Sequence, residues 1–389
     1  MRRILFLAWR YVAYHRGKTA ILTAALTLTT ILPLSAHLLI DRYGESLIAR
    51  AQATPLVLGA KGNRFDLVLK ALYFSPASVD PVYMSEVDSI RESELGEPIP
   101  LHLRFTARKR PLVGTTLEYF EFRALSLRNG ALPTVLGQAV LGSKIAAELE
   151  KDVGSSLFSD QQTLYDITKT YPLKMSIVGV LKESGTPDDE AVFVDIKTAW
   201  IIEGIMHGHQ DVTTVQDESV ILGRDNDTVV ANASIVQYHE VTPENVDSFH
   251  THSASDELPV TAIIVVPSDL KSGTLLKARY NLSESQRMLV PLEVVEELMH
   301  LVFRIKRFFD ANFALILVST GLFIALVVLL SHRLRKREME TMHKIGCSRL
   351  TVFWLQAAEL AIVLTMSLAV SVTLSLVVVS MAPHIMRLK

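Results

Sequence analysis

Three long apolar runs stand out from the short hydrophobic and polar segments that alternate along the rest of the chain. They cover residues 20–40, 313–330 and 360–382, and none of them contains a charged residue. A helix rises about 1.5 Å per residue, so each run has the length needed to cross a hydrocarbon core of about 30 Å. The pattern therefore predicts three transmembrane helices.

The first run has a basic flank and so has a second interpretation, as a cleaved signal peptide. Its apolar stretch is longer than the roughly 7–15 residues of a signal. Ser35 and Ala36 also make a poor cleavage site. We interpret this run as an uncleaved membrane anchor.

Between the first two runs, at about residues 41–312, short strand patterns alternate with short helical ones. Strands are expected at 54–58, 139–142, 175–181, 191–195 and 261–266, and helices at 65–74, at 144–151 and from Lys197 onward. Ser143 is a suitable N-cap for the helix 144–151, and Gly154 follows its end. The alternation predicts layers of strands and helices in an α+β domain. The polar, weakly patterned stretch 212–257 is interpreted as an inserted lobe or a flexible flap.

An amphipathic helix is predicted at 291–310, directly before the second apolar run. Its apolar residues recur at helical spacing opposite a charged face: Leu292, Val295, Leu298, Val302, Ile305 and Phe309. If this helix continues into the membrane, it joins the domain rigidly to the second span. The alternative is that this helix only packs on the domain. The two interpretations are compatible, because one helix can pack on the domain and also continue into the membrane.

Lysine and arginine predict the orientation of the spans, because these residues concentrate in cytoplasmic loops. Arg2, Arg3, Arg10, Arg16 and Lys18 precede the first span, and Arg333, Arg335, Lys336, Arg337, Lys344 and Arg349 lie between the second and third. Both segments are therefore expected in the cytoplasm, with residues 41–312 and the C-terminus outside. The sequence predicts a multi-pass protein of the bacterial inner membrane with a cytoplasmic N-terminus.

Composition agrees with a membrane protein and limits its partners. Hydrophobic residues make up 49% of the 389 residues and the mean hydropathy is +0.29, mainly because of the three apolar runs. The net charge of −2 indicates no nucleic-acid partner. The single cysteine, Cys347, excludes an intramolecular disulfide.

No catalytic motif accompanies this architecture, so no catalytic residue is expected and the chain is not predicted to be an enzyme. The nearest approach to a phosphate-binding loop, 137–142 followed by Ser143 and Lys144, reverses the required order of the lysine and the hydroxyl residue. The sequence patterns of serine hydrolases, zinc proteases and Cys-x-x-Cys redox sites are also missing. His37 and, just before the third run, Glu359 are the ionisable residues of the spans, which argues against a hydrophilic solute path.

Five histidines gather in or beside the polar lobe: His207, His209, His239, His250 and His252. His-x-His pairs in such loops can bind Zn²⁺ or Cu²⁺. They also occur as ordinary surface residues, and no carboxylate spacing completes a site here. The five are weak candidates for metal ligands, and no metal site is assigned.

The segment between the second and third runs carries a distinctive spacing. Glu338 follows Arg337, Gly346 comes eight residues later, and Glu359 thirteen residues after that. This spacing resembles that of the FtsX/MacB-like ABC transporter permease family. The N-terminus, with Ala8, Arg10, Arg16 and Lys18, is similar to the family's cytoplasmic N-terminal helix. The stretches 59–62, 67–69, 178–181, 185–188 and 192–194 resemble one subgroup, which has a Gly-Ala-Lys-Gly motif in its periplasmic domain.

The expected fold is thus a membrane protein with three α-helical transmembrane segments plus an α+β extracytoplasmic domain, which the resemblance makes one of MacB-like periplasmic type. The resemblance implies the permease subunit of an ABC transporter complex. In this family ATP-driven motion is passed to the outer domain, and the permease forms no solute channel. The resemblance assigns contact with the ATPase to six residues: Arg337, Glu338, Lys344, Gly346, Arg349 and Glu359.

The resemblance also implies partners. These are a cytoplasmic ABC ATPase dimer, a second permease copy or another permease, a periplasmic lipoprotein or adaptor, and the lipid bilayer. ATP would act only through the partner subunit, so no cofactor is expected in this chain.

The resulting plan divides the chain into five parts. Residues 1–41 hold the N-terminal cytoplasmic helix and the first span, 42–290 the extracytoplasmic domain with its polar lobe at about 205–257, 291–331 the stalk helix and the second span, 332–352 the cytoplasmic coupling segment, and 353–389 the third span and a short tail. The family usually has a fourth span and a glycine-rich third one. Here the third run has no glycine, and small residues of other types occupy it: Ala361, Ser367, Ala369, Ser371 and Ser375.

Two other functions fit the same plan. One is a signalling or regulatory membrane protein whose outer domain controls a periplasmic partner. The other is a metal-handling component that uses the histidine-rich lobe. A co-purifying nucleotide-binding subunit would distinguish the permease from a free-standing receptor.

Overall fold

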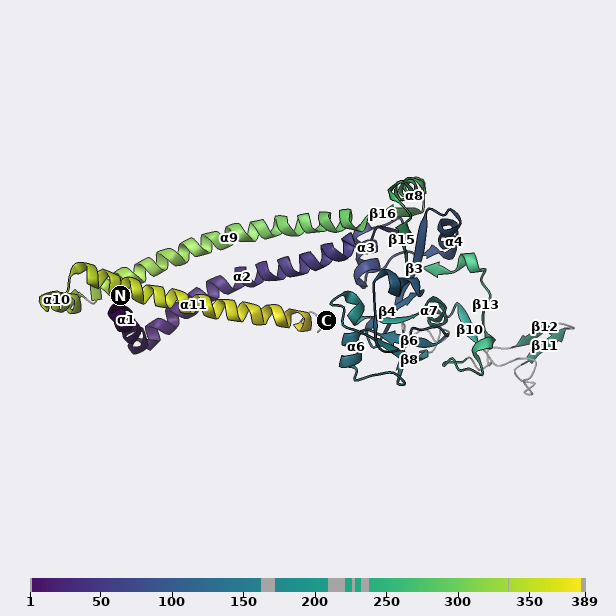
Figure 1. Cartoon of the computed structure of the whole chain (residues 1–389), viewed down its shortest axis with the longest axis horizontal. Coiled ribbons are helices and arrows are strands. Elements are labelled where there is room, and N and C mark those ends of the chain that lie inside the picture. Colours follow the sequence, from purple (N-terminus) through teal and green to yellow (C-terminus); the bar gives the residue numbers. More distant parts are fainter. Residues whose placement is uncertain are drawn as a thin grey trace. The chain divides into compact units, whose positions relative to one another are not determined.

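Three helices of the computed structural model have the length and composition of membrane spans. They are α2 (Arg16–Gln52), α9 (Pro291–Leu334) and α11 (Arg349–Ile385) (Figure 1). The structure describes residues 2–161, 172–208, 221–225, 228–231, 238–334 and 336–385. Within these residues the prediction of three membrane helices is confirmed.

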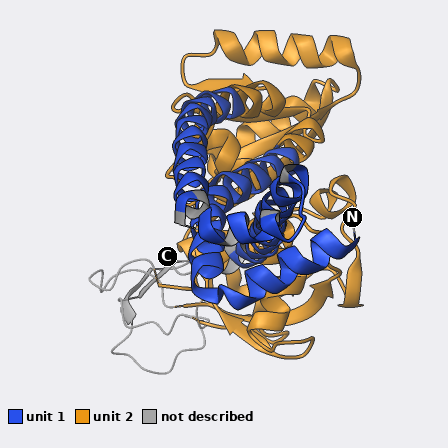
Figure 2. Cartoon of the chain, turned by 90° about the vertical axis from the view of Figure 1, so that its left-hand side faces the viewer, with its two compact units in different colours: residues 1–47, 299–389 blue, residues 48–298 orange. Residues whose placement is uncertain are grey.

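The chain forms two compact units, coloured separately in Figure 2. The helical unit holds residues 1–47 and 299–389, and the α/β unit holds residues 48–298. Two helices, α2 and α9, have residues in both units. The amphipathic stretch 291–310 and the second apolar run are parts of the single helix α9.

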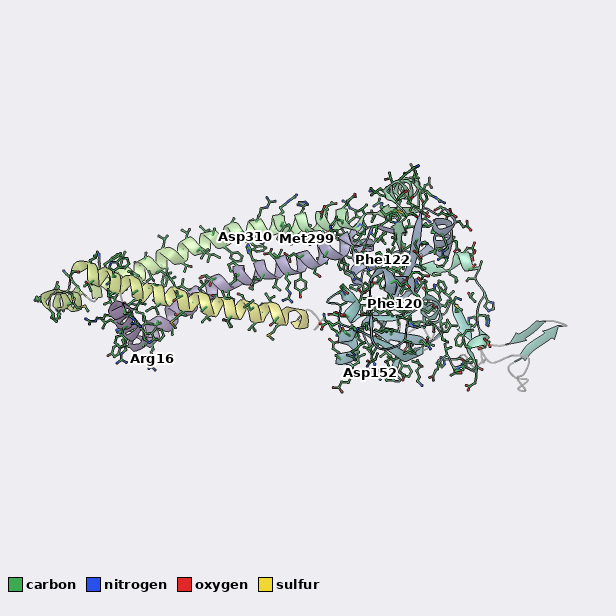
Figure 3. All side chains as sticks on the ribbon, viewed as in Figure 1. Arg16, Phe120, Phe122, Asp152, Met299 and Asp310 are labelled. Carbon is green, nitrogen blue, oxygen red and sulfur yellow. The ribbon has the colours of Figure 1, made fainter. Side chains whose placement is uncertain are left out.

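The helical unit begins with α1 (Arg2–Tyr14), which packs against α11 and buries Ala8 and Val12. His15 separates α1 from α2. The Thr19 hydroxyl donates to the Val12 carbonyl across this break at 3.1 Å. Arg16, labelled in Figure 3, donates from Nε to the Ala13 carbonyl at 3.2 Å. These bonds hold the bend between the two helices.

Polar contacts join α2 to α9 at the end of the apolar run of α2 and just beyond it. The Lys306 ammonium lies 3.4 Å from the Asp41 carboxylate, and His37 Nδ1 lies 3.8 Å from Asp310. Asp310 and Met299 are labelled along α9 in Figure 3. Both contacts are made inside the helical unit, and they place α2 beside α9 near the α/β unit's sequence boundary.

The α/β unit is built on one mixed sheet in the order β16-β1-β15-β3-β4-β9-β6-β8-β5, with β7 also paired to β8. Its strands are β1 (Leu56–Ala60), β3 (Gly96–Ala107), β4 (Arg110–Thr115), β5 (Leu127–Gly130), β6 (Gln138–Leu141), β7 (Ser156–Phe158), β8 (Lys174–Leu181), β9 (Val192–Asp195), β15 (Ala262–Pro267) and β16 (Gln286–Leu289). The pairs β4–β9 and β6–β8 are parallel, and the other pairs are antiparallel.

Short helices cover this sheet: α3 (Arg64–Tyr73), α4 (Met84–Glu92), α5 (Glu118–Phe122), α6 (Ser143–Glu148), α7 (Ile196–Glu203) and α8 (Leu270–Leu282). The central strands are buried on both faces, as Ile263, Ile264 and Val265 of β15 show with no exposed surface. This burial explains their continuous apolar sequence. Strands β1, β6, β8, β9 and β15 and helices α3 and α7 lie where the sequence predicts them.

The predicted N-cap of α6 is wrong by one residue. Gly142 is the cap, and Ser143 is the first helical residue. A Cβ at position 142 would lie 2.4 Å from the carbonyl oxygens of Asp188 and Asp189, so the 3₁₀ turn η1 (Pro187–Glu190) leaves room only for glycine. The helix also ends at Glu148 and not at Lys151. Glu150 has a φ of 50°, which a helix cannot continue through.

In the polar lobe the described residues form two ribbons. Strand β10 (Met206–Gly208) pairs with β13 (Phe249–Thr251), and β11 (Ile221–Asp225) pairs with β12 (Thr228–Ala231). A third small pair, β2 (Val82–Tyr83) with β14 (Pro259–Val260), lies beside β3. The 3₁₀ turns η3 (Val246–Ser248) and η4 (Ser255–Glu257) flank β13 in the sequence.

Candidate functional site

A short exposed helix separates the second and third membrane helices. This helix, α10 (Lys336–Lys344), contains three of the predicted coupling residues: Arg337, Glu338 and Lys344. The side chains of Arg337 and Lys344 are exposed. Those of Glu338 and Arg349 lie outside the described part of the structure, although their backbone belongs to α10 and α11.

Gly346 ends α10 and has a φ of +100°. The Cys347 N–H donates to the Met342 carbonyl at 3.0 Å. A glycine in the left-handed region followed by this bond is the Schellman arrangement that stops a helix. Nothing in the described part of the chain lies within 4 Å of a Cβ built at Gly346, so within the chain itself the positive φ, and not lack of space, favours glycine.

Ser348 starts the next helix directly. Its hydroxyl accepts from the Thr351 N–H at 3.2 Å, which is the bond an N-cap serine makes. The turn between the two helices therefore has a defined end of α10, at Gly346, and a defined start of α11, at Ser348. The turn presents Ile345, which is 78% exposed. This surface, residues 336–348, is hereafter the α10 turn.

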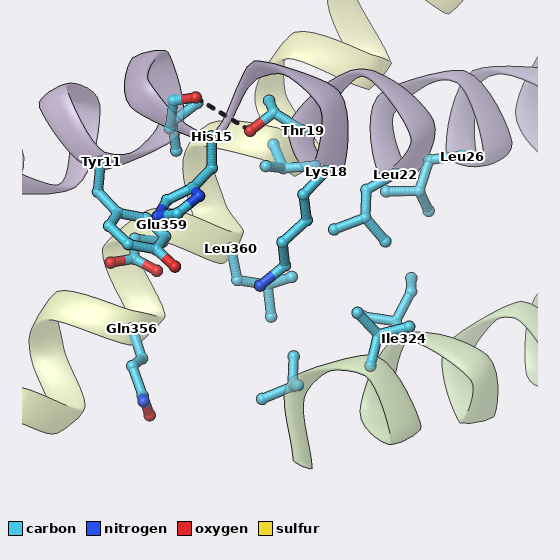
Figure 4. Close-up of a pocket in the computed structure, with 14 residues that line it drawn as sticks. Tyr11, His15, Lys18, Thr19, Leu22, Leu26, Ile324, Gln356, Glu359 and Leu360 are labelled. Atoms are coloured by element: carbon cyan, nitrogen blue, oxygen red, sulfur yellow. Dashed lines mark hydrogen bonds between the residues drawn. The ribbon is translucent and has the colours of Figure 1, made fainter. Parts of the chain in front are cut away.

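Glu359 lies apart from the α10 turn, farther along α11. It lines a cavity of about 70 Å³ inside the helical unit. Tyr11, His15 and Lys18 line the same cavity from the N-terminal segment, and Figure 4 shows them around it. The dashed line there is the bond from the Thr19 hydroxyl to the Val12 carbonyl.

The cavity combines charged and apolar walls. Glu359 and Gln356 come from α11, Lys18 from α2, and Ile324, Val327 and Val328 from α9. A carboxylate and an ammonium that share a cavity with apolar walls attract each other more strongly than they would in water. The structure thus brings Glu359 to the N-terminal basic segment and away from the α10 turn.

A line of buried hydroxyls joins α2 to α11. Ser367, Ser371 and Ser375 recur every four residues on one face of α11, and each is at most 4% exposed. The Ser371 hydroxyl lies 2.5 Å from that of Thr30, and the Thr27 hydroxyl donates to the Ser367 carbonyl at 3.4 Å. Small residues permit close approach of membrane helices, and hydroxyls supply bonds between them. Three of the small residues noted in the third run are therefore contact residues.

Inside the α/β unit, a buried charge cluster joins the end of α2 to the turn η1. Arg50 donates from Nη1 to Asp188 Oδ2 at 2.6 Å and from Nη2 to Oδ1 at 3.0 Å. The Tyr119 hydroxyl donates to Asp188 Oδ1 at 2.7 Å, and the Thr186 hydroxyl donates to Oδ2, also at 2.7 Å. The two Asp188 carboxylate oxygens thus accept four hydrogen bonds, all from residues of the α/β unit. A buried ion pair is stable only when its remaining polar atoms are hydrogen-bonded in this way.

The cluster changes the pKa values of its members. Burial alone would raise the pKa of Asp188, but the hydrogen bonds and charge of Arg50 outweigh burial and lower it. Burial and the nearby Asp188 charge raise the pKa of Tyr119. Burial also raises the pKa of Tyr73 to about 12. The aspartate is therefore held ionised and both phenols neutral.

Sequence reasoning missed Arg50 and Tyr119. Asp188 was noted only within the stretch 185–188, and nothing in the sequence near Arg50 distinguishes it from the exposed arginines. A buried partner reveals itself only when distant segments meet, here across 138 residues.

The structure brings together three of the five histidines: His207, His250 and His252. His239 is exposed and is not part of this group. His209 lies outside the described residues. The motif stretch 59–62 spans the end of β1 and the turn into α3, where Asn63 is the N-cap.

The comparisons with known proteins concern both units. A family model described as "FtsX-like permease C-terminal" matches residues 312–388. No curated protein matches the chain. Among solved structures, the extracellular domain of the noncanonic ABC-type transporter YknZ from Gram-positive bacteria is 11% identical, covers 60% of this chain and 98% of its own, and has a TM-score of 0.33.

Two further structures show the same level of likeness. The periplasmic region of MacB from Actinobacillus actinomycetemcomitans is 11% identical, covers 65% of this chain and 97% of its own, with a TM-score of 0.36. A domain of a putative permease protein from Porphyromonas gingivalis is 10% identical, covers 59% and 78%, and has a TM-score of 0.28. The family match includes the α10 turn, Glu359 and the α11 serines. Residues 312–388 are therefore similar to the C-terminal part of FtsX-like permeases.

Proposed function

We propose that the chain is the permease subunit of an ABC transporter complex and that it transmits ATP-driven motion to the α/β unit. One observation carries the proposal. The segment that matches the permease family contains an exposed turn with defined ends, placed between two helices of membrane length. Such a turn offers a rigid docking surface to a second protein.

The charges of the N-terminal segment and of the α10 turn favour one orientation. Both segments are rich in lysine and arginine, so under the positive-inside rule both lie in the cytoplasm and the α/β unit lies outside the bacterial inner membrane. The partner would be a cytoplasmic ABC ATPase dimer, and ATP would be bound by that partner. A second permease copy and a periplasmic lipoprotein or adaptor complete the proposed complex.

The continuous helices support transmission of motion. Helices α2 and α9 each extend without a break from the helical unit into the α/β unit. Inside the α/β unit, the Arg50–Asp188 pair joins the end of α2 to η1. Displacement of the α10 turn by an ATPase would move α9, and α9 would carry that displacement along its axis.

Co-purification tests the partner. Full-length protein with a C-terminal affinity tag is isolated from its native membrane. Bound proteins are identified by mass spectrometry, and the ATP hydrolysis of the isolated complex is measured. We expect a nucleotide-binding subunit with the wild type, and loss of that subunit with Arg337→Glu/Lys344→Glu. Lys271→Glu, an exposed residue of α8, is the matched control and should retain it. If the wild type brings down no ATPase, the proposal fails.

A helix-breaking variant tests transmission in the purified complex. Phe308 and Phe309 are exposed on α9, at 68% and 52%. Replacing both with glycine weakens the helix by about 1 kcal/mol per position relative to alanine. ATP should change amide hydrogen exchange in the α/β unit of the wild type and of Phe308→Ala/Phe309→Ala. The glycine pair should keep ATPase association but lose this change; an unaltered response would exclude α9 as the transmitter.

A further inference from the structure

Three histidines of the polar lobe converge on one point. His207 in β10 lies directly opposite His250 in β13 in the strand register. His252 comes two residues after His250, one residue beyond the end of β13. One nitrogen from each ring lies within 4.8 Å of the others.

The three rings lie close together and are inclined to one another. Ring centroids are 4.9 Å apart for His207–His250, 5.2 Å for His207–His252 and 4.9 Å for His250–His252, and the planes are inclined by 43° to 84°. The rings are therefore not stacked face to face. Zn–N bonds of about 2.0–2.1 Å place tetrahedral ligand nitrogens roughly 3.3 Å apart, so small side-chain rotations would close this group on a metal ion.

One ring is already oriented as a ligand. His250 Nδ1 lies 2.9 Å from the Ser248 carbonyl oxygen. When Nδ1 carries the proton and donates it to that carbonyl, Nε2 is the nitrogen with the lone pair that can bind a metal. This backbone contact is the usual outer partner of a metal-binding histidine. Ser248 is itself held by its hydroxyl, which donates to the Asn245 carbonyl at 2.6 Å.

The histidine group is anchored in the hydrophobic core on one side and exposed to solvent on the other. Phe249, between the turn and His250, is 8% exposed and anchors β13 in the core. His207 and His250 are half-buried, and His252 is exposed. A metal ion can thus enter from solvent without rearrangement of the strands.

We propose that His207, His250 and His252 form a binding site for a divalent transition metal of the Zn²⁺ class. Three neutral imidazoles suit Zn²⁺, which commonly takes three protein ligands and a water. Among the described residues, no fourth histidine, cysteine or acidic side chain joins the group. The fourth position is therefore open to water or to a ligand brought by another molecule. This site is independent of the proposed ATPase coupling.

The test uses the full-length protein, carrying a tag without histidines and freed of metal with a chelator. Co²⁺ alone is titrated first, because tetrahedral Co²⁺ gives visible absorption bands. Zn²⁺ alone should then displace it, and equilibrium dialysis should count one Zn²⁺ per chain. We expect His207→Ala, His250→Ala and His252→Ala each to weaken Zn²⁺ binding by more than about 100-fold, since loss of an outer partner alone costs about 10–100-fold.

His239→Ala is the matched control, because His239 is exposed and outside the group. It should bind Zn²⁺ as the wild type does. All variants should melt at the wild-type temperature in chelator, and Zn²⁺ should raise the melting temperature only of the wild type and His239→Ala. Zn²⁺ binding that survives the triple substitution, or wild-type protein that binds no Zn²⁺, would overturn the proposal.

Discussion

The Arg50 guanidinium, near the end of α2, forms a two-point ion pair with the Asp188 carboxylate of η1, with Nη1 2.6 Å from Oδ2 and Nη2 3.0 Å from Oδ1. The side chains are 6% and 1% exposed. Arg50 lies in the part of α2 that belongs to the α/β unit, so the pair joins this end of α2 to η1 inside that unit. A planar guanidinium matches both carboxylate oxygens at once, which a lysine ammonium cannot do.

Removing one partner of this pair should destabilise the α/β unit strongly. We expect Arg50→Ala or Asp188→Ala to lower the free energy of unfolding by about 3–5 kcal/mol, because each leaves an uncompensated buried charge. Arg50→Lys should also destabilise, through loss of the second hydrogen bond. Chemical unfolding of the detergent-solubilised protein, followed by tryptophan fluorescence, measures the change.

The exposed pair Arg64–Glu297 offers the matched control for that prediction. Its side chains are 44% and 49% exposed. Exposed ion pairs contribute about 0–1 kcal/mol. Arg64→Ala should therefore leave unfolding nearly unchanged, and an equal effect of Arg64→Ala and Arg50→Ala would show that burial is not the cause.

The same pair predicts a pH dependence of stability. Burial opposes ionisation of Asp188, but the bonds and charge of Arg50 lower its pKa below the value of about 3.9 in the unfolded chain. Between these two pKa values the unfolded state binds more protons, so stability falls as the pH falls. The contribution is complete above about pH 4 and is lost as the pH drops through the folded-state pKa.

Comparing the stability of the wild type with that of Asp188→Asn at each pH separates the contribution of Asp188 from those of the other carboxylates. The wild type should be more stable than Asp188→Asn above pH 4, and the difference should shrink below it. Tyr119, Arg123 and Thr186 also face the carboxylate, and none of them gains or loses a proton in this range. A difference that stays constant from pH 5 to pH 2 would contradict the assignment.

The hydroxyl contact between α2 and α11 predicts a size limit at Ser371, which is fully buried. Ser371→Ala should cost about 0.6 kcal/mol, the average for a hydrogen bond between membrane helices. Ser371→Leu should cost more, about 1–3 kcal/mol, because the helices would have to separate. The temperature at which each variant aggregates in detergent ranks the variants by stability. Ser380→Leu, on an exposed position of the same helix, should behave as the wild type.

The membrane architecture could be predicted from the sequence because the bilayer imposes a length. An uncharged run that spans the hydrocarbon core has few alternative folds, so all three helices were expected. Five of the sheet strands, β1, β6, β8, β9 and β15, were predicted for a related reason, since strands buried on both faces, such as β15, are continuous apolar runs.

Contacts between distant segments could not be predicted. Arg50 meets Asp188 only after the sheet assembles. The cap at Gly142 depends on the close approach of η1, so Ser143 was the better choice from local rules alone. Glu359 shows a third case. Its spacing from Gly346 groups the two in sequence, whereas the fold gives Glu359 a place in the cavity with Lys18.

Gly346 allows a last prediction that separates two explanations of the α10 turn. If glycine is needed only because its φ is +100°, any side chain strains the backbone by about 1–2 kcal/mol, and asparagine less than others. Association with the ATPase should then decrease in the order wild type, Gly346→Asn, Gly346→Ala, Gly346→Val. If an ATPase surface packs directly on the Gly346 Cα, every side chain should block it, and asparagine should do no better than alanine. Quantitative co-purification, with protease sensitivity of the turn in the isolated permease as the measure of strain, distinguishes the two. In the first case strain and loss of association rise together, and in the second association is lost to the same extent whatever the strain.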